Sequence, residues 1–179
     1  MRWTTYDHVH LDRVATPWLI LRFVDPAAEF DFVPFGSVPT LSEGTTAFGI
    51  PGVGIGAHDA AGTAFEKTVR YYELTDPVLD AVGRIVAAGV RHALGLPPAP
   101  AETAEESAIG ATLDRLGSGA ALHTPDLRNI EMSIPMYDAL YLYCGIRDLP
   151  EQVLANAPQT PAARISYLRR FVGAPGRQT

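Results

Sequence analysis

The spacing of hydrophobic and polar positions along the chain predicts more helix than strand. Residues Glu29–Val33 alternate polar and apolar side chains, as a half-buried strand does, and Ala47–Ile50 is a second, weaker strand candidate. Apolar residues recur at helical spacing in about six other stretches. The pattern therefore predicts an α+β or α/β class, mostly helical with a small β-sheet. The helical stretches are residues 16–24, 76–94, 102–116, 124–134, 135–144 and 161–172.

Three of the expected helices begin with the same signature, an N-cap residue followed by proline at the first helical position. These pairs are Thr16-Pro17, Asp76-Pro77 and Thr124-Pro125. The later Pro135 lacks an amide hydrogen, so it should either kink the third helix or begin a new one. By periodicity Trp18 faces inward from the first helix.

The segment 96–101 reads Leu-Pro-Pro-Ala-Pro-Ala, a stiff, extended stretch that helix and sheet both disfavour. We interpret it as a linker between an α/β part, at about residues 1–95, and a helical part, residues 102–179. Because 179 residues fit one ordinary domain, the sequence favours a single domain built from both parts.

Composition narrows the class of protein. With 47% hydrophobic and 19% charged residues the chain can bury a core. Fourteen Lys and Arg against 20 Asp and Glu give a net charge of −6, which argues against nucleic-acid or anionic-membrane partners. No signal-peptide core and no run of 18 apolar residues occurs, so we expect a soluble, cytoplasmic protein. The single cysteine, Cys144, excludes an intramolecular disulfide and a multi-cysteine zinc site.

The first candidate for chemistry is the run His8-Val9-His10-Leu11-Asp12-Arg13. In extended chain, His8, His10 and Asp12 would share one face. Two imidazoles and a carboxylate form a ligand set that suits zinc, iron or manganese. Alternatively, Asp12 pairs with Arg13 or caps a turn.

The second candidate is His58, which follows three glycines at alternate positions, Gly52, Gly54 and Gly56. The segment lacks the spacing of a dinucleotide or phosphate-binding loop. Alternating glycines indicate close approach of the backbone to a neighbour or a ligand. His58 is either a residue of a site or a hydrogen-bonded structural histidine.

The third candidate is the aromatic run from Pro135 to Cys144, in which Tyr137 and Tyr141 share a helix face and Asp138 lies one step round. It is either an amphipathic core helix whose tyrosine hydroxyls reach water, or a pocket wall containing Tyr141 and Cys144.

Several of these residues carry a resemblance to a known family. The run from His10 to Pro26 resembles the opening motif of the chromate-resistance domain at the C-terminus of ChrB-type regulators. Its matching residues are His10, Asp12, Arg13, Ala15, Pro17, Trp18, Leu19, Ile20, Arg22, Phe23, Asp25 and Pro26. Further matches follow in order over roughly residues 8–145. They are Glu29-Phe-x-Phe-Val-Pro, Gly52-Val53 with His58, Phe65-Glu66 and Met136–Tyr141.

The resemblance implies a chromate-responsive scaffold whose DNA binding is attributed to an additional N-terminal region. This chain starts almost at the motif, so we expect it not to bind DNA. It departs from the family at three places: Thr16 stands for the usual Cys, Leu21 for the first of two arginines, and Leu127 for a frequent His. Cys144 does match. The lost thiol and cation suggest a scaffold adapted to another substrate.

Our leading hypothesis is a small-molecule enzyme with a divalent metal (Fe, Mn or Zn) held by His10 and His58, plus Glu29 or Asp12. Two histidines and one carboxylate would leave coordination positions open, as catalytic sites do.

In that hypothesis Arg13 and Arg22 orient an anionic substrate, although Arg22 could instead pair with Asp25. Glu66 or Tyr141 would transfer protons. One alternative is a non-catalytic domain that senses chromate or another oxyanion. Another is a metal-independent acid–base enzyme built from His58 and Asp12. The expected partner is a small anionic molecule, and a homodimer is compatible with the sequence.

Overall fold

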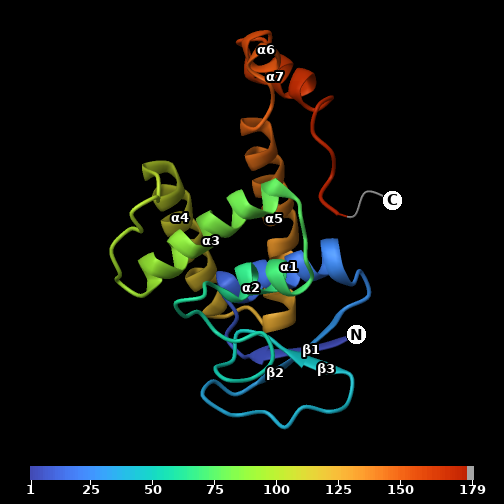
Figure 1. Cartoon of the computed structure of the whole chain (residues 1–179), viewed down its shortest axis with the longest axis vertical. Coiled ribbons are helices and arrows are strands. Elements are labelled where there is room, and N and C mark those ends of the chain that lie inside the picture. The colour runs from blue at the N-terminus through green and yellow to red at the C-terminus, as the bar shows by residue number, and fades with distance from the viewer. Residues whose placement is uncertain (177–179) are drawn as a thin grey trace.

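The computed structural model describes residues 1–176, in which a small sheet lies at one end and helices cover it (Figure 1). Its architecture is α+β and mostly helical, as the sequence pattern predicts. The strands are β1 (Arg2–Tyr6), β2 (Glu29–Val33) and β3 (Thr45–Ala47). The helices are α1 (Asp12–Leu19), the π-helix η1 (Ile20–Val24), α2 (Ala64–Tyr71), α3 (Pro77–Ala93), α4 (Ala104–Ala121), α5 (Asp126–Arg147), α6 (Glu151–Ala155) and α7 (Pro161–Leu168).

The sheet is parallel, with strand order β2-β1-β3, so the first strand of the chain lies in the middle. The strand predicted at Glu29–Val33 is confirmed as β2. The second expected strand begins earlier, at Thr45. Sequence reasoning missed β1 because this central strand is buried on both faces from Trp3 to Tyr6 and does not alternate.

The helix start predicted at Asp76 is confirmed, because the Asp76 carboxylate accepts a hydrogen bond from the Val78 amide at 2.9 Å. The start predicted at Thr16 is wrong. Helix α1 begins four residues earlier, at Asp12, and Thr16 and Pro17 lie buried inside it. Thr16 donates its hydroxyl hydrogen to Asp12 within the helix, at 3.3 Å, instead of capping an end.

The helix expected after Thr124 begins at Asp126 and runs without interruption through Pro135 to Arg147. Pro125 occupies the position before the helix, so Thr124 is not its cap. Proline removes one hydrogen bond from a helix interior, and here that loss does not end the helix.

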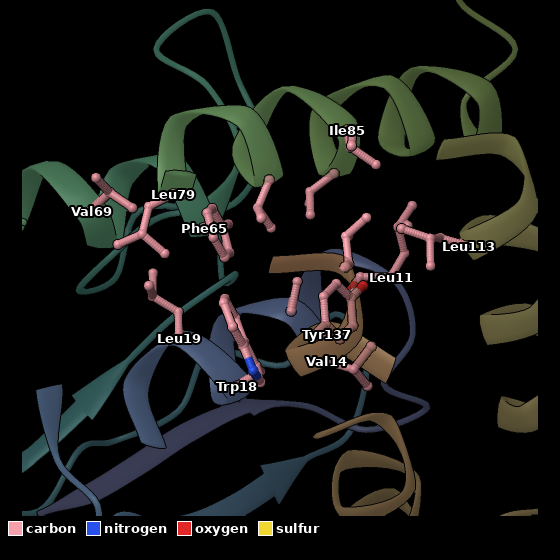
Figure 2. Packing of buried hydrophobic residues seen from close by; sticks show 14 of the residues in the cluster. Leu11, Val14, Trp18, Leu19, Phe65, Val69, Leu79, Ile85, Leu113 and Tyr137 are labelled. Atoms are coloured by element: carbon pink, nitrogen blue, oxygen red, sulfur yellow. The ribbon is translucent and has the colours of Figure 1, made fainter. Parts of the chain in front are cut away.

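The hydrophobic core centres on Trp18, which is fully buried among α1, α2, α3 and α5 (Figure 2). Its indole stacks on Phe65 with ring centroids 6.3 Å apart and an interplanar angle of 7°. The ring centroids of Tyr137 and Tyr141 each lie 6.0 Å from the centroid of the Trp18 indole. The inward orientation of Trp18 follows from its helical spacing, as expected.

Asp138 joins α1, η1 and α5 through three hydrogen bonds. It accepts from the Trp18 indole at 2.8 Å and from the Arg22 guanidinium at 2.9 and 2.7 Å. The alternative pairing of Arg22 with Asp25 is therefore wrong; Asp25 pairs with the amino group of Met1. Burial alone would raise the pKa of the Asp138 carboxyl, but the hydrogen bonds from Arg22 and Trp18 outweigh burial and lower it.

This lowered pKa predicts acid-sensitive stability. The Asp138 carboxylate stabilises the folded state above its unfolded pKa of 3.8, and this contribution is lost as the pH falls through the lower folded value. The free energy of unfolding of the wild type should therefore drop in acid more steeply than that of Asp138→Asn. Urea titrations at a series of pH values measure the free energy of unfolding of both proteins, and Asp31→Asn, at an exposed position, is the control. Parallel pH profiles for wild type and Asp138→Asn would contradict it.

The segment 96–101 connects α3 to α4, and the two helices pack directly against each other. A Cβ on Gly89 would lie 2.8 Å from the Gly110 carbonyl oxygen, so both glycines are needed for this close approach. Helices α6 and α7 lie at the end of α5 that is remote from the sheet (Figure 1). None of the helices in residues 1–176 has the length and hydropathy that a membrane span requires.

Candidate functional site

A cavity of about 320 Å³ lies where the three parallel strands end. The segments that follow β1, β2 and β3 each contribute to its wall, and the end of α3 closes one side. Ligands of parallel sheets bind beyond the carboxyl ends of the strands, where neighbouring connections diverge, and β1 lies between its two successors here. The lining residues are Tyr6, His10, Leu11, Asp12, Arg13, Phe35, Gly49, Pro51, Ala57, His58, Val90, Ala93 and Leu94.

The turn between β1 and α1 brings His10 and Asp12 to this cavity, but not by the extended geometry that the sequence suggested. Strand β1 ends at Tyr6, and His8 and Leu11 have positive φ angles of 54° and 50°. His8 is exposed and is not part of the cavity wall. The shared face of His8, His10 and Asp12 is therefore a wrong prediction, because alternation holds only in a strand.

Helix α5 holds this strained turn in place. Asp126 accepts a hydrogen bond from the Val9 amide at 2.7 Å, and Asn129 donates to the Val9 carbonyl at 2.7 Å. The Tyr137 hydroxyl donates to the Leu11 carbonyl at 3.2 Å. Residues with positive φ persist where their surroundings determine the backbone so fully.

Asp12 anchors the start of α2. Its carboxylate accepts hydrogen bonds from the amides of Ala64 at 2.9 Å and Phe65 at 3.0 Å, and one from the Thr16 hydroxyl. Burial raises the pKa of Asp12, and these hydrogen bonds partly oppose the rise. Because both carboxylate oxygens already accept hydrogen bonds, the geometry favours Asp12 as a positioning residue over a free proton acceptor.

Arg13 lies beside Asp12 at the cavity wall. Two of its N–H groups donate to the carbonyls of Asp7, at 3.0 Å, and His8, at 3.3 Å. Its guanidinium carbon lies 5.9 Å from the centre of the Phe35 ring. A guanidinium has five N–H groups, so Arg13 can also donate to a ligand. Burial lowers its pKa, partly offset by nearby acidic groups, and the residue stays cationic.

Gly49 makes room for this arginine. Its φ is +65°, and a Cβ built on it would lie 3.3 Å from Cγ of Arg13. A side chain at this position would be strained and would crowd Arg13.

His58 is the polar residue of the cavity with an unsatisfied ring atom. Its Nδ1 is buried and has no hydrogen-bond partner among residues 1–176. Lys67, the only lysine of the chain, holds the loop on both sides: it donates to the Ala57 carbonyl and pairs with Asp59 at 2.8 Å. The alternative role of His58, a structural histidine held by hydrogen bonds, is therefore not fulfilled at its Nδ1 atom.

The other expected site residues lie elsewhere. Glu29 is exposed at the first position of β2, beside Arg2 at the opposite end of the sheet. Arg22 pairs with Asp138, as described above. Glu66 forms a capping box with Thr63 at the start of α2. The Tyr141 hydroxyl donates to Asp76, and burial raises the pKa of this tyrosine. Each of these four side chains has a structural partner. The Thr63–Glu66 pair has the spacing of a capping box, whereas the partners of Glu29, Arg22 and Tyr141 are distant in the sequence.

Of the expected metal ligands, the structure thus brings His10, His58 and Asp12 to one cavity and leaves Glu29 apart. Within residues 1–176, no three or more His, Cys, Asp or Glu side chains are grouped so that they could hold a metal ion.

Sequence reasoning missed Tyr6, Phe35 and the end of α3 as parts of the site. The signal that could have found Tyr6 and Phe35 is their position directly after β1 and β2, but β1 itself was not recognised. The local sequence does not distinguish Val90, Ala93 and Leu94 from core residues of a helix. They differ from core residues only because they line the cavity.

Cys144 lies in α5 away from the cavity wall, with 1% of its surface exposed. Burial raises the pKa of its thiol to about 11. We therefore expect an aromatic disulfide reagent at neutral pH to label Cys144 slowly in the native protein and rapidly in denaturant, since the thiolate is the reactive form. Equal labelling rates in the two conditions would contradict this. Absorbance of the released thiolate gives both rates.

The fold and the cavity together define an α+β domain with a cavity at the carboxyl edge of a parallel sheet. The family described as ChrB, C-terminal domain matches residues 3–144, and the chain belongs to this family. The resemblance noted from the sequence is thereby confirmed, and the matched range contains every residue of the cavity wall. Searches of curated proteins and of solved structures gave no match.

Proposed function

We propose that this domain binds a small anionic molecule in the cavity, with Arg13 and His58 as the groups that contact the anion. The observation that carries the proposal is the cationic Arg13 side chain in the wall of a cavity that His58 also lines. A guanidinium and an imidazole that line the same cavity can both donate hydrogen bonds to one anionic group.

The charges around the cavity favour an anionic ligand over a neutral or cationic one. Arg13 is permanently cationic and has N–H groups in addition to the two that hold Asp7 and His8. The negative charge of Asp12 is compensated locally, because its carboxylate accepts from the amides at the positive end of the α2 dipole. Asp126 and Asp7 also lie near Arg13 but do not line the cavity. The lining therefore presents one cation and two histidines, His10 and His58, to a ligand.

The test is calorimetric titration of the purified protein with chromate, sulfate, phosphate and simple carboxylates. We expect Arg13→Gln and His58→Phe each to weaken the binding of a retained anion by about 10–100-fold, as the loss of a charge-assisted hydrogen bond does. Arg128→Gln is the matched control, since Arg128 is exposed on α5 and pairs with Glu131. Circular dichroism verifies that each variant is folded.

Because Arg13 also holds the turn before α1, Arg13→Lys is included to retain the charge with fewer donors. The proposal is wrong if none of these anions binds the wild type, or if affinity is unchanged in both Arg13→Gln and His58→Phe.

A second candidate is an enzyme at the same cavity, which the shared position of His10, His58 and Asp12 favours. In its metal-dependent form, the two histidines would hold iron, manganese or zinc; in its metal-independent form, His58 would exchange protons beside Asp12. Elemental analysis of the purified protein separates the two forms. Stoichiometric metal that is lost in His10→Ala and His58→Ala supports the first, and turnover that survives chelation supports the second.

A further inference from the structure

Besides its polar groups, the cavity has an apolar wall. This apolar wall consists of Leu11, Phe35, Pro51 and three residues at the C-terminal end of α3, which are Val90, Ala93 and Leu94. An inorganic oxyanion has no apolar surface to place against such a wall. This wall is thus unexplained by anion binding alone.

Two large apolar side chains of this wall are exposed to solvent. Phe35 has 74% of its surface exposed and Leu94 has 59%, and they come from distant segments, the loop after β2 and the C-terminal end of α3. Scattered single apolar residues are normal on a surface, but apolar residues that converge on one pocket mark a ligand contact.

The Phe35 ring is also held in position. Its backbone amide donates to the Asp7 carboxylate at 2.9 Å, and its ring lies 5.1 Å from that of Tyr6. Arg13 approaches the same ring, so the anion-binding group and the apolar wall are adjacent. A ligand that fits both needs an anionic group joined directly to an apolar body.

The size of the cavity leads to the same conclusion. Its volume of about 320 Å³ is many times the ~10–15 Å³ that a cavity needs to hold one water molecule. A tetrahedral oxyanion has only five non-hydrogen atoms, so it would leave much of the space to water. The volume lies at the lower end of the range for small organic ligands.

We infer that the ligand of this cavity is an organic acid, with its anionic group at Arg13 and His58 and its apolar part between Phe35 and the end of α3. This inference rests on the proposed function and specifies the class of ligand. Phe35 and Leu94 are the residues that select the apolar part.

The experiment is a calorimetric titration with the straight-chain monocarboxylates from acetate to hexanoate, together with benzoate, chromate and sulfate. Each added methylene should tighten binding about fourfold, which corresponds to ~0.8 kcal/mol per buried methylene. Hexanoate and benzoate should bind more tightly than either inorganic anion.

Two variants test the apolar wall. Phe35→Ala and Leu94→Ala should each weaken hexanoate binding by about tenfold and change acetate binding by less than about twofold, because acetate does not reach the wall. Both side chains are largely exposed, so neither change should unfold the protein. Leu122→Ala is the matched control, with Leu122 85% exposed and away from the cavity wall.

The outcomes separate this inference from the proposed function. Equal affinities along the carboxylate series, with inorganic oxyanions bound as tightly, would overturn the organic-acid inference and leave anion binding intact. Loss of acetate and hexanoate binding to the same extent in Phe35→Ala would also overturn it. Failure of every anion to bind would refute both.

Discussion

Trp18→Ala should lower the free energy of unfolding by about 3–5 kcal/mol, the usual cost of truncating a fully buried tryptophan. Trp18 has no exposed surface and stacks on Phe65. The substitution opens a cavity at the junction of four helices and removes one hydrogen bond from Asp138. Urea unfolding followed by circular dichroism measures the change.

Trp18→Phe separates packing from the hydrogen bond. It retains most of the ring and loses the indole N–H, so we expect a smaller loss of about 1–2 kcal/mol. The surface variant Leu122→Ala should stay within ~0.5 kcal/mol of the wild type. A loss below about 1 kcal/mol for Trp18→Ala would show that the core repacks around the gap.

Asp12→Ala should lower the free energy of unfolding by about 2–4 kcal/mol. Two amides at the start of α2, those of Ala64 and Phe65, lose their acceptor, and each unsatisfied donor costs ~1–3 kcal/mol. Asp12→Asn keeps one acceptor oxygen and should lose less. The exposed Asp31→Ala is the matched control, and the same urea titrations measure all three.

The pH dependence gives a second readout for Asp12. Its pKa is raised in the folded protein, chiefly by burial, so the folded state holds this proton more tightly than the unfolded chain. Stability contributed by the protonated carboxyl is present below the unfolded pKa of 3.8 and is lost as the pH rises through the folded value. Asp12→Asn should not show this loss. If its profile matches that of the wild type, the carboxyl of Asp12 does not titrate as proposed.

The two predictions for Asp12 concern the structural unit formed by α2 and the loop before it. Asp12 fixes the start of α2, and Lys67 on α2 fixes the loop that presents His58. The stability of α2 and the geometry of the cavity are therefore coupled. We expect Asp12→Ala to weaken anion binding even where the protein remains folded.

Much of the fold follows from local sequence. The alternation of Glu29–Val33 and the Asp76-Pro77 start of α3 needed no tertiary information, because pleating and capping depend on neighbouring residues. The start of α1 did not follow. Thr16-Pro17 has the local chemistry of a cap, but the distant amides of α2 provide partners for Asp12, and the helix begins there instead.

For the site, sequence established which residue types are present, and three of the metal-ligand candidates, His10, His58 and Asp12, do reach one cavity. Only the tertiary structure decided which of the charged residues are free to act. Arg22 pairs with Asp138 on α5, and the Tyr141 hydroxyl donates to Asp76 at the start of α3. Glu66 is the exception, because its capping box with Thr63 is a local pattern. Local sequence determines hydrogen bonds within a turn and burial within a periodic helix. Long-range contacts determine whether a carboxylate, guanidinium or imidazole is already satisfied, and that decides its chemistry in this protein.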